Sequence, residues 1–476
     1  MKDVIIIGAG IAGLSSGYEL QKENIDFQIL ESSGHVGGNI ESIKINDYLL
    51  ETGPYTFTSS NTEVLQLVKE LELEEALIQA NKGSKKRYVH FMSKLIQVPT
   101  GPGEFFKTEL LSGSAKRILF EELFIEKEEK EETVEDFFSR RFGREVLKNL
   151  IQPYVCGVFA GDVQKLSINA VFPELKKLEQ KYKSVILGFL LSRGFKRPSG
   201  KWTLYSFKDG MKTLPETIHE KLKNKITLNA SGIEVTRAKD FFIVSFKLGG
   251  KLITHTTNSV LFAVPAYEIL NYSHLFPSQH SMELFQIEYL PVAVVSQIIE
   301  KSKTNFDLDG FGYLCTKEPH RKILGTIWCS SIFPDRAPSE KALLNTIIGG
   351  SYYKKIAEQQ EDDIKTLVSK EVAEILKLSS PASLETIFIK VHKKAIPQYH
   401  LGHLERVKRI EEVMDKNFGL FFTGNYFYGI SLNDTIKTSK TVVEKIKRFL
   451  NEFKKEQRPQ IVDQRPKEPV TNIYSK

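Results

Sequence analysis

The sequence predicts an α/β chain divided into two or three domains, and three observations support this prediction. The chain has 476 residues, more than a single hydrophobic core usually organises. Residues 3–31 have the pattern of a β-α-β unit, and strand-like runs return after residue 225, behind a helical segment. The composition, 41% hydrophobic and 26% charged, is typical of a globular protein and excludes a disordered or collagen-like chain.

The opening unit consists of two short apolar strands and the helix between them. Asp3–Ile7 is a β-branched run suited to a buried parallel strand, and Phe27–Leu30 predicts the next strand. Ile11–Lys22 has helical periodicity. The first turn of such a unit is where dinucleotides bind.

Three glycines occupy that turn at the spacing of a dinucleotide fingerprint. Gly8 permits the tight turn, Gly10 lets the backbone approach a pyrophosphate, and Gly13 brings helix and strand together. The N-terminus of the following helix adds free N–H groups and a positive dipole end. Glu31 follows the second strand, where a carboxylate accepts hydrogen bonds from ribose hydroxyls. A glycine-rich turn without a ligand and a surface glutamate are the alternatives.

The middle of the chain alternates between charged helix and strand. Glu126–Glu132 is charge-rich and leads into Glu135–Phe142, for which we expect a solvent-facing helix at the entry to a helical region. Four strand-like runs follow it, so the helical region interrupts a discontinuous fold. These runs are Lys225–Leu228, Phe241–Phe246, Ser259–Val264 and Val292–Ile299.

The C-terminal part predicts a helix over 358–376, a strand over Leu420–Thr423 and an amphipathic helix over Thr435–Asn451. Beyond residue 454 the chain is polar, charged and proline-bearing without periodicity, so we expect a frayed tail over 454–476.

Cysteine content and charge narrow the classes of site. Cys156, Cys315 and Cys329 lack the Cys-x-x-Cys spacing of metal and redox sites, so we expect neither metal nor disulfide, and a reducing compartment. The net charge of +7 is spread over many lysines, which suits anionic substrates, an anionic membrane or a merely solvated surface, and gives no sign of nucleic-acid binding. No apolar run approaches the roughly 18 to 20 residues that span a bilayer.

A set of motifs around the first glycines resembles the amine-oxidase superfamily of flavoproteins. It comprises Gly8 to Gly17, Glu31, Gly37-Gly38, Glu51-Thr52-Gly53-Pro54 and the closing segment Thr423–Thr435. The resemblance implies noncovalently bound FAD lying extended across the domain. In the superfamily a basic residue usually follows the glycine pair, where this chain has Asn39. The cofactor-binding residues implied are Gly8, Gly10, Ile11, Ala12, Gly13, Glu31, Ser32, Gly37, Gly38, Asn39, Gly53, Pro54, Tyr55, Gly424, Asn425, Gly429, Ile430, Ser431 and Leu432.

Six further segments are similar to the protoporphyrinogen oxidases within that superfamily. They are Arg140–Val146, Gly157–Asp162, Lys165–Pro173, Gly310–Gly312, Phe333–Pro338 and Ala395–His403. This resemblance implies an oxidoreductase that converts protoporphyrinogen IX to protoporphyrin IX in heme biosynthesis, with O₂ as electron acceptor. Oxidation of coproporphyrinogen III to coproporphyrin III, a flavin amine oxidase or carotenoid desaturase, and a flavin-carrying scaffold without turnover remain as alternatives.

The same resemblance implies roles for three residues at the substrate. Arg87 pairs with a propionate, Phe311 packs on the macrocycle, and the carbonyl of Gly157 approaches it. The alternatives are a surface cation cluster, an ordinary core phenylalanine and a turn glycine that needs positive φ. No side chain stands out as a catalytic base, and we expect His400 and His403 to be structural.

The resemblance also predicts the domain organisation. A Rossmann-like FAD-binding domain comprises 1–83, 195–262 and 395–453, and an α+β substrate domain comprises 263–394. A helical domain over 84–194 carries Phe105-Phe106 and Val185–Leu191, which suit peripheral contact with the cytoplasmic face of the cell membrane or a buried helix. Hand-off of the product to ferrochelatase and a homodimer are compatible with this organisation.

Overall fold

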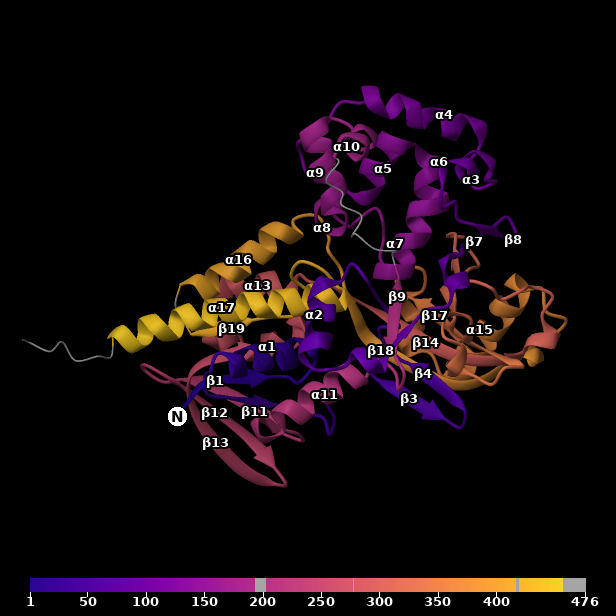
Figure 1. The fold of residues 1–476 in the computed structure, drawn as a ribbon. Helices are drawn as coiled ribbons and strands as arrows, with labels where there is room; N and C mark the ends of the chain where they lie inside the picture. Colours follow the sequence, from indigo (N-terminus) through magenta and orange to yellow (C-terminus); the bar gives the residue numbers. More distant parts are fainter. Residues whose placement is uncertain (193–202, 277, 417–418, 457–476) are drawn as a thin grey trace, which may run out of the picture.

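The computed structural model describes residues 1–192, 203–276, 278–416 and 419–456, and these form three bodies (Figure 1). The first-sheet domain carries both the N-terminus and the long C-terminal helix. The second-sheet domain lies beside it, and a helical lobe, residues 102–191, stands above both in the view of Figure 1. Expectations for 195–202 and for the tail from residue 457 lie outside the described residues.

The sheet of the first-sheet domain is parallel at its centre, in the order β10-β2-β1-β13-β12-β11, with β19 also pairing with β13. The buried run Val4–Ile7 explains the parallel pairing, because a strand covered on both faces has no polar alternation. Each of the runs predicted as strands forms one here or in the second sheet. The strands are β1 (Lys2–Ile7), β2 (Phe27–Leu30), β10 (Ile226–Thr227), β11 (Ser231–Arg237), β12 (Phe242–Leu248), β13 (Lys251–Phe262) and β19 (Leu420–Phe422).

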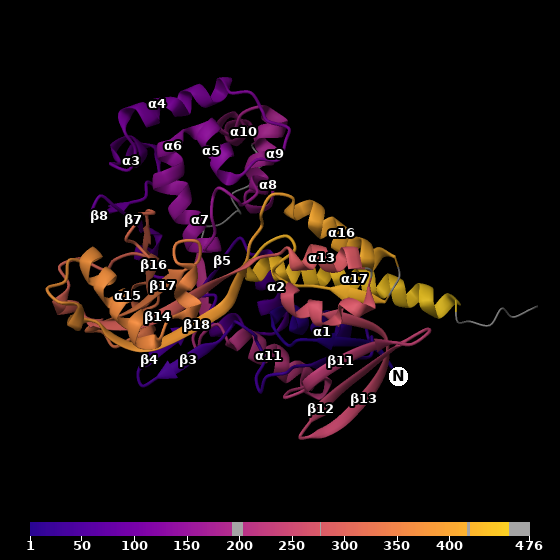
Figure 2. The same ribbon diagram turned by 180° about the vertical axis from the view of Figure 1, so that it is seen from behind.

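Helices cover this sheet on both faces, and α1 and α17 lie side by side (Figure 1, Figure 2). The helix predicted over Ile11–Lys22 is confirmed as α1. The C-terminal helix is longer than expected at both ends, because its apolar face continues along the sheet. The helices are α1 (Ile11–Lys22), α2 (Thr62–Glu70), α11 (Thr213–Leu222), α12 (Ala266–Ile269), α13 (Ser278–Phe285), α16 (His403–Asp415) and α17 (Leu432–Glu456).

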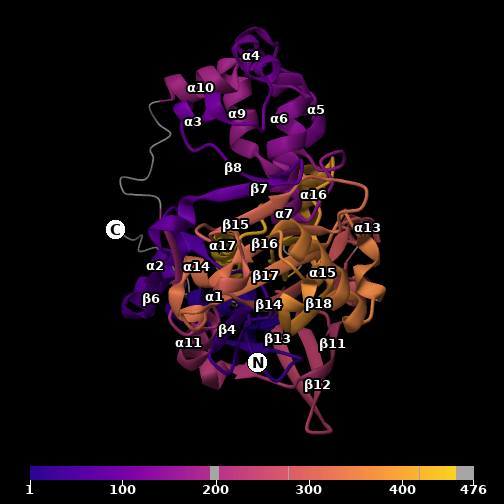
Figure 3. The same ribbon diagram turned by 90° about the vertical axis from the view of Figure 1, so that its right-hand side faces the viewer.

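The second sheet has the order β18-β14-β17-β16-β15-β7-β8 and is antiparallel except where β7 pairs with β15. Helix α15 (Glu361–Ile375) packs Ile364, Val368 and Val372 on it and confirms the helix expected over 358–376. The strands are β7 (Arg87–Phe91), β8 (Lys94–Gln97), β14 (Tyr289–Glu300), β15 (Gly312–Cys315), β16 (Ile323–Trp328), β17 (Lys341–Gly349) and β18 (Glu385–Pro397). Figure 3 views the molecule from the side of this domain.

Two small sheets and one short helix lie between the two large sheets. The strands β3 (Ser42–Ile45) and β4 (Tyr48–Glu51) form a hairpin, and α14 (Cys329–Ile332) contributes to the same apolar cluster as β4. The second small sheet is β5 (Phe57–Thr58), β9 (Leu204–Phe207) and β6 (Leu77–Gln79).

Two of the predicted domain boundaries are wrong. Residues 87–97, expected in the helical domain, form β7 and β8 of the second sheet, because β7 finds a parallel partner in β15, more than 200 residues later in the chain. Residues 263–287, expected in the substrate domain, bury Ala266, Ile269 and Leu284 in the core of the first-sheet domain. The sequence of a short amphipathic segment does not indicate in which of two hydrophobic cores the segment will pack.

The helical lobe is organised by charges rather than by apolar residues alone. Its helices are α3 (Pro102–Lys107), α4 (Gly113–Glu121), α5 (Val134–Phe142), α6 (Arg144–Val146), α7 (Gln152–Phe159), α8 (Ile168–Val171), α9 (Pro173–Tyr182) and α10 (Val185–Leu191). The expectation that Glu135–Phe142 faces solvent is wrong, since Phe137, Phe138 and Arg141 of α5 are buried. A spacing of charges along one helix does not reveal that partners on other segments neutralise them.

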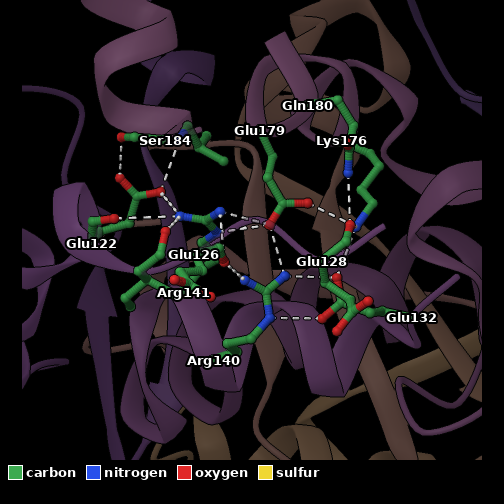
Figure 4. Close-up of polar contacts among 12 residues, drawn as sticks. Glu122, Glu126, Glu128, Glu132, Arg140, Arg141, Lys176, Glu179, Gln180 and Ser184 are labelled. Carbon is green, nitrogen blue, oxygen red and sulfur yellow. Dashed lines mark hydrogen bonds and ion pairs between the residues drawn. The ribbon is translucent and has the colours of Figure 1, made fainter. Parts of the chain in front are cut away.

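Those partners form one buried network (Figure 4). Arg141 lies 3.1 Å from Glu122 and 2.8 Å from Glu179, and all three side chains are fully buried. Arg140 joins Glu179 to Glu132, both at 2.7 Å. Lys176 of α9 pairs with the same two glutamates, at 2.9 Å from Glu132 and 2.7 Å from Glu179. The network therefore ties α5, α9 and the segment before α5 together.

Candidate functional site

The glycine turn lies between β1 and α1, as the sequence predicts. Gly8 has φ of +102°, which favours glycine, and a Cβ added at Gly13 would overlap the carbonyl oxygen of Gly8. Gly10 is different, because it has φ of −67° and a Cβ there would meet no atom within 4 Å. The space beside Gly10 is therefore open to a ligand, and the N–H groups at the start of α1 face the same end of the helix.

Glu31 lies at the end of β2, against this turn. Its carboxylate accepts the N–H of Ala9 at 2.7 Å and the N–H of Ser33 at 2.8 Å. The Ser32 hydroxyl donates to it at 3.3 Å. Glu31 is half-buried, so its carboxylate is held beside the glycine turn and still reaches solvent, as an acceptor for ribose hydroxyls requires.

The second glycine pair packs directly on the first turn. The N–H of Gly37 donates to the carbonyl oxygen of Ala9 at 2.9 Å, and Gly37 and Gly10 form an isolated parallel bridge. Both Gly37 and Gly38 have positive φ, at 101° and 61°. Asn39 follows as an exposed residue, so a short amide stands at the position that is basic in the superfamily.

The segment that includes Gly53, Pro54 and Tyr55 lies next to Asn39. A Cβ added at Gly53 would overlap the carbonyl oxygen of Asn39, so only glycine permits this approach. Gly53 is exposed and Pro54 half-buried, whereas Tyr55 is buried and its hydroxyl donates to the carbonyl oxygen of Cys329 at 3.1 Å. Tyr55 therefore connects this segment to the second-sheet domain.

The closing segment turns from β19 into α17. Gly424 has φ of +157°, and the side chain of Asp434 fills the space where Gly429 would carry a Cβ. The Ser431 hydroxyl accepts the N–H of Asp434 at 3.1 Å and donates to its carboxylate at 2.6 Å. Ser431 thus has the geometry of the N-cap of α17. Asn425, Gly429, Ile430 and Ser431 keep exposed surface, and Leu432 is buried.

These segments meet at one edge of the first sheet. The strands β1, β2, β13 and β19 are parallel neighbours, so their carboxyl ends lie together, which is where open α/β sheets bind ligands. Helices α1 and α17 begin at this edge, and the Ser439 hydroxyl of α17 donates to the carbonyl oxygen of Ala12 at 3.1 Å. Two helix N-termini, an open approach at Gly10 and the acceptor Glu31 fit the pyrophosphate and ribose of FAD.

The three residues expected at the substrate lie around the junction of β7, β15 and α7. The Arg87 guanidinium lies 5.2 Å from the centroid of the Phe311 ring, and the N–H of Phe311 donates to the carbonyl oxygen of Lys86 at 2.8 Å. Gly157 lies within α7 with helical backbone, and a Cβ there would overlap Leu314 of β15. Gly157 therefore has no positive φ, and close packing of α7 on β15 explains the glycine.

The face of α7 around Gly157 is exposed and apolar. Tyr154 and Val158, which lie one helical turn apart on α7, are 46% and 39% exposed. Burial raises the pKa of Tyr154, and the charge of Arg87 partly offsets this rise. Arg87 is exposed and Phe311 half-buried. A flat apolar molecule with a carboxylate has matching contacts here: ring faces from Phe311 and Tyr154, and a cation from Arg87.

Sequence reasoning missed a buried pair between the two sheet domains. Glu51 of β4 and Arg336, both almost fully buried, lie 3.8 Å apart. Glu51 also accepts the Ser42 hydroxyl at 2.6 Å and the N–H of Met211 at 2.9 Å. Burial raises the pKa of Glu51 to about 7. The segments ETGP and FPDRAP contain these two residues, but nothing in either pattern pairs them.

The two histidines differ in environment. His400 is half-buried, 3.7 Å from Glu288. His403 is fully buried, and its Nε2 donates to the carbonyl oxygen of Phe427 at 3.0 Å. The three cysteines are buried and free, and the described part of the chain holds no group of three or more His, Cys, Asp or Glu side chains suited to a metal ion.

Comparison with known proteins identifies the family. The family model described as flavin containing amine oxidoreductase matches residues 11–447. Coproporphyrinogen III oxidase of Bacillus subtilis is 29% identical, with 93% of this chain and 97% of the Bacillus protein aligned. Protoporphyrinogen oxidase 1 of Spinacia oleracea chloroplasts is 30% identical over 95% of this chain and 85% of the spinach protein. A crystal structure described as a putative protoporphyrinogen oxidase from Exiguobacterium superposes with a TM-score of 0.80 at 22% identity, over 94% of this chain and 99% of that one.

Proposed function

The chain belongs to the flavin containing amine oxidoreductase family and is an FAD-dependent oxidoreductase, and we propose that it oxidises protoporphyrinogen IX to protoporphyrin IX with O₂ as electron acceptor. The observation that carries the proposal is the pairing of Arg87 with Phe311 beside Tyr154 of α7, in a chain whose relatives of known activity oxidise porphyrinogens. We assign the reaction to heme biosynthesis.

We propose that the cofactor lies along the carboxyl edge of the first sheet. The N-terminus of α1 and the backbone at Gly10 hold the pyrophosphate, and Glu31 accepts the ribose hydroxyls. The backbone of Asn425 to Leu432, at the N-terminus of α17, would hold the flavin end, where the positive end of the helix dipole would stabilise negative charge. FAD bound there would supply two-electron oxidation of the substrate in each cycle, with O₂ reduced to hydrogen peroxide.

We assign positioning rather than proton transfer to the residues at the substrate. Arg87 fixes a propionate, the ring of Phe311 lies on the macrocycle, and the backbone carbonyl of Gly157 receives a pyrrole N–H. Placing the macrocycle between these groups excludes water from one face and holds the reacting carbon toward the cofactor. We assign no general base to a side chain: three hydride transfers from meso carbons leave three protons, two from pyrrole N–H groups and one from the remaining meso carbon by tautomerisation, and water can accept them.

Coproporphyrinogen III is the second candidate substrate. It is supported by the 29% identity to the Bacillus subtilis enzyme over nearly the whole of both chains. The two substrates differ in charge, since coproporphyrinogen III carries four propionates and protoporphyrinogen IX two. Aerobic incubation of the FAD-loaded protein with each porphyrinogen, and with a primary amine, separates the candidates by porphyrin fluorescence and flavin bleaching. We expect faster fluorescence with protoporphyrinogen IX; bleaching by the amine alone would contradict both assignments.

The cofactor assignment is tested most directly at Gly10. In Gly10→Ala the new methyl group meets no protein atom, so the fold is kept while the methyl group occupies the space assigned to the pyrophosphate. We expect FAD affinity to fall at least about tenfold, with an unchanged unfolding transition of the FAD-free protein. Gly113→Ala, at another position where a Cβ meets no atom within 4 Å, is the matched control. Unchanged FAD affinity in Gly10→Ala would exclude this placement of the cofactor.

The substrate assignment is tested at Arg87. Replacing Arg87 by Ala removes a charge-assisted contact with a carboxylate, so we expect KM to rise about tenfold or more and kcat to change less. Lys86→Ala is the control, because Lys86 is a neighbouring exposed cation paired with Asp309. An unchanged KM in Arg87→Ala would remove this residue from the substrate site.

We also propose that exposed apolar side chains of the helical lobe contact a membrane surface from the cytoplasmic side. Phe124 is 86% exposed, Leu190 73% and Phe106 58%, on three different segments of the lobe. Exposed apolar side chains at this density suit peripheral insertion into a bilayer. None of the helices in the described residues is long and apolar enough to cross a membrane. A peripheral position would favour transfer of a poorly soluble porphyrin to ferrochelatase.

A further inference from the structure

The rings of Tyr399 and His403 stack on each other and bind the turn between β19 and α17. The Tyr399 and His403 rings lie 4.0 Å apart between centroids, with an angle of 15° between their planes. The Tyr399 hydroxyl donates to the carbonyl oxygen of Asn425 at 2.5 Å. His403 Nε2 donates to the carbonyl oxygen of Phe427 at 3.0 Å. Each ring therefore holds a different peptide of the same turn.

Both rings are buried, so these hydrogen bonds do not compete with solvent. Tyr399 is 1% exposed and His403 is fully buried. Because Phe427 offers a carbonyl oxygen, Nε2 must carry the proton, and burial lowers the pKa of His403 to about 4, which keeps the ring neutral. Removing either donor would leave a buried carbonyl without a partner, which is more unfavourable than losing an exposed hydrogen bond.

The segment that carries the rings is itself anchored to the helical lobe. The N–H of Ser167 donates to the carbonyl oxygen of Tyr399 at 2.8 Å, and the N–H of Leu401 donates to that of Lys165 at 3.1 Å. The Gln398 side chain donates to the carbonyl oxygen of Phe159 at 2.9 Å. Segment 398–403 is therefore a rigid connection between the end of α7, the loop before α8 and the turn.

We propose that Tyr399 and His403 are positioning residues that set the peptide orientations of the turn from Gly424 to Leu432, and through it the affinity and the electronic environment of FAD. The inference rests on the FAD site proposed above, in which this turn faces the flavin. Neither side chain contacts the cofactor directly in this scheme. Each binds the carbonyl oxygen of one peptide of the turn, and the N–H group of that same peptide points in the opposite direction. A tilted peptide at Asn425 or Phe427 would re-aim those N–H groups.

Three substitutions distinguish the loss of a hydrogen bond to the turn from a change in side-chain packing. Tyr399→Phe keeps the ring and removes only the hydroxyl donor. His403→Leu removes the second donor, whereas His403→Gln retains an N–H near the position of Nε2. Tyr272→Phe is the matched control, because Tyr272 is also buried in the first-sheet domain and its hydroxyl donates to a backbone carbonyl, that of Ile233 at 3.1 Å, outside the turn.

FAD binding and the flavin spectrum are the readouts. We expect the FAD dissociation constant to rise about fivefold to tenfold in Tyr399→Phe and in His403→Leu, as the loss of one buried hydrogen bond predicts. At saturating FAD, the visible absorption bands of these two variants should be shifted from those of the unsubstituted protein. His403→Gln should stay within about threefold in affinity, and Tyr272→Phe should change melting temperature without changing either readout.

The possible outcomes distinguish this inference from the proposed function. If Tyr399→Phe and His403→Leu bind FAD within twofold of the unsubstituted protein, with the same spectrum, the inference is overturned while the cofactor assignment stands. The inference is also overturned if Tyr272→Phe changes FAD affinity and the flavin spectrum as much as Tyr399→Phe does, since loss of stability would then explain both changes. If the unsubstituted protein fails to bind FAD, both the proposed function and this inference are wrong. If the variants show the expected shifts but no porphyrinogen is oxidised, only the proposed substrate is wrong.

Discussion

The first-sheet domain and the helical lobe differ in what they bury. The first-sheet domain has an apolar core, and the lobe has an apolar core together with a buried network of ion pairs. The first-sheet domain buries strands such as Val4–Ile7 between helices, and its polar groups at the cofactor edge are mostly backbone N–H and C=O. The helical lobe buries Arg141, Glu122 and Glu179 inside, while Phe124 and Leu190 are exposed. The lobe also has an apolar core, which includes Phe137 and Leu178, and the buried ion pairs are added to it.

The two bodies therefore depend on different interactions for their stability. Buried ion pairs contribute little net stability over apolar packing, but breaking one leaves an uncompensated charge. A lobe held by such a network keeps one arrangement of α5, α9 and α10 while its outer apolar side chains take no part in the core. In the first-sheet domain the apolar core supplies the stability.

The largest expected effect comes from breaking the charge network. Arg141→Met leaves Glu122 and Glu179 buried with fewer cations, so we expect the free energy of unfolding of the lobe to fall by about 3–5 kcal/mol. Hydrogen exchange of α5 and α10 amides, with FAD bound, measures this locally. Arg144→Met, at an exposed arginine of α6, is the control. Equal protection in Arg141→Met and the control would mean that the network does not hold the lobe.

A core truncation in the first-sheet domain should act globally instead. Leu261 is fully buried on the central strand β13, so Leu261→Ala should lower the free energy of unfolding by about 2–5 kcal/mol through cavity formation. Leu252→Ala on the same strand, where the side chain is 70% exposed, should change it by less than about 0.5 kcal/mol. Chemical denaturation followed by circular dichroism gives both values, and similar losses in the two variants would contradict the assigned core.

Ionisation of Glu51 should make the junction between the sheet domains pH-dependent. Burial raises the pKa of Glu51 from 4.5 to about 7 in the folded chain, so the protonated form is favoured by folding. Its contribution is therefore fully present below pH 4.5 and is lost as pH rises through 7, by about 3 kcal/mol.

The test is the pH dependence of unfolding in Glu51→Gln. Because Gln does not titrate, the fall in unfolding free energy between pH 4.5 and 7 should be smaller in this variant by about that amount. Parallel curves for the variant and the unsubstituted protein would show that Glu51 is not strained by burial, and that Arg336 offsets its desolvation completely.

The smallest expected effect on stability is at the exposed apolar side chains of the lobe. Phe124→Ser with Leu190→Ser should change the free energy of unfolding by less than about 0.5 kcal/mol, because neither side chain is in a core. Co-sedimentation with vesicles of anionic phospholipid should nevertheless fall. Leu252→Ser, an exposed leucine of the first-sheet domain, is the control, and equal sedimentation of all variants would contradict membrane contact by these side chains.

The sequence by itself determined the cofactor end of this protein. The strand Asp3–Ile7, the glycines of the first turn and Glu31 lie within 31 residues, and each local conformation they require is set by short-range steric rules. Helix α1 and strand β2 therefore have the bounds predicted, and Gly37 of the second glycine pair packs against Gly10 of the first turn. Strand-like runs likewise predicted β10, β12, β13 and β19 of the first sheet, but only β14 of the second.

Only the tertiary structure decided which distant segments meet. The pairing of β7 with β15, the ion pair of Glu51 with Arg336, and the inward orientation of Arg141 each join residues far apart in the chain. Periodicity and propensity describe one element at a time, so they cannot tell a charge that faces water from one that meets a buried partner. The contacts of Tyr399 and His403 with the closing turn depend on the same three-dimensional arrangement, because their acceptors are backbone carbonyls that carry no sequence signature.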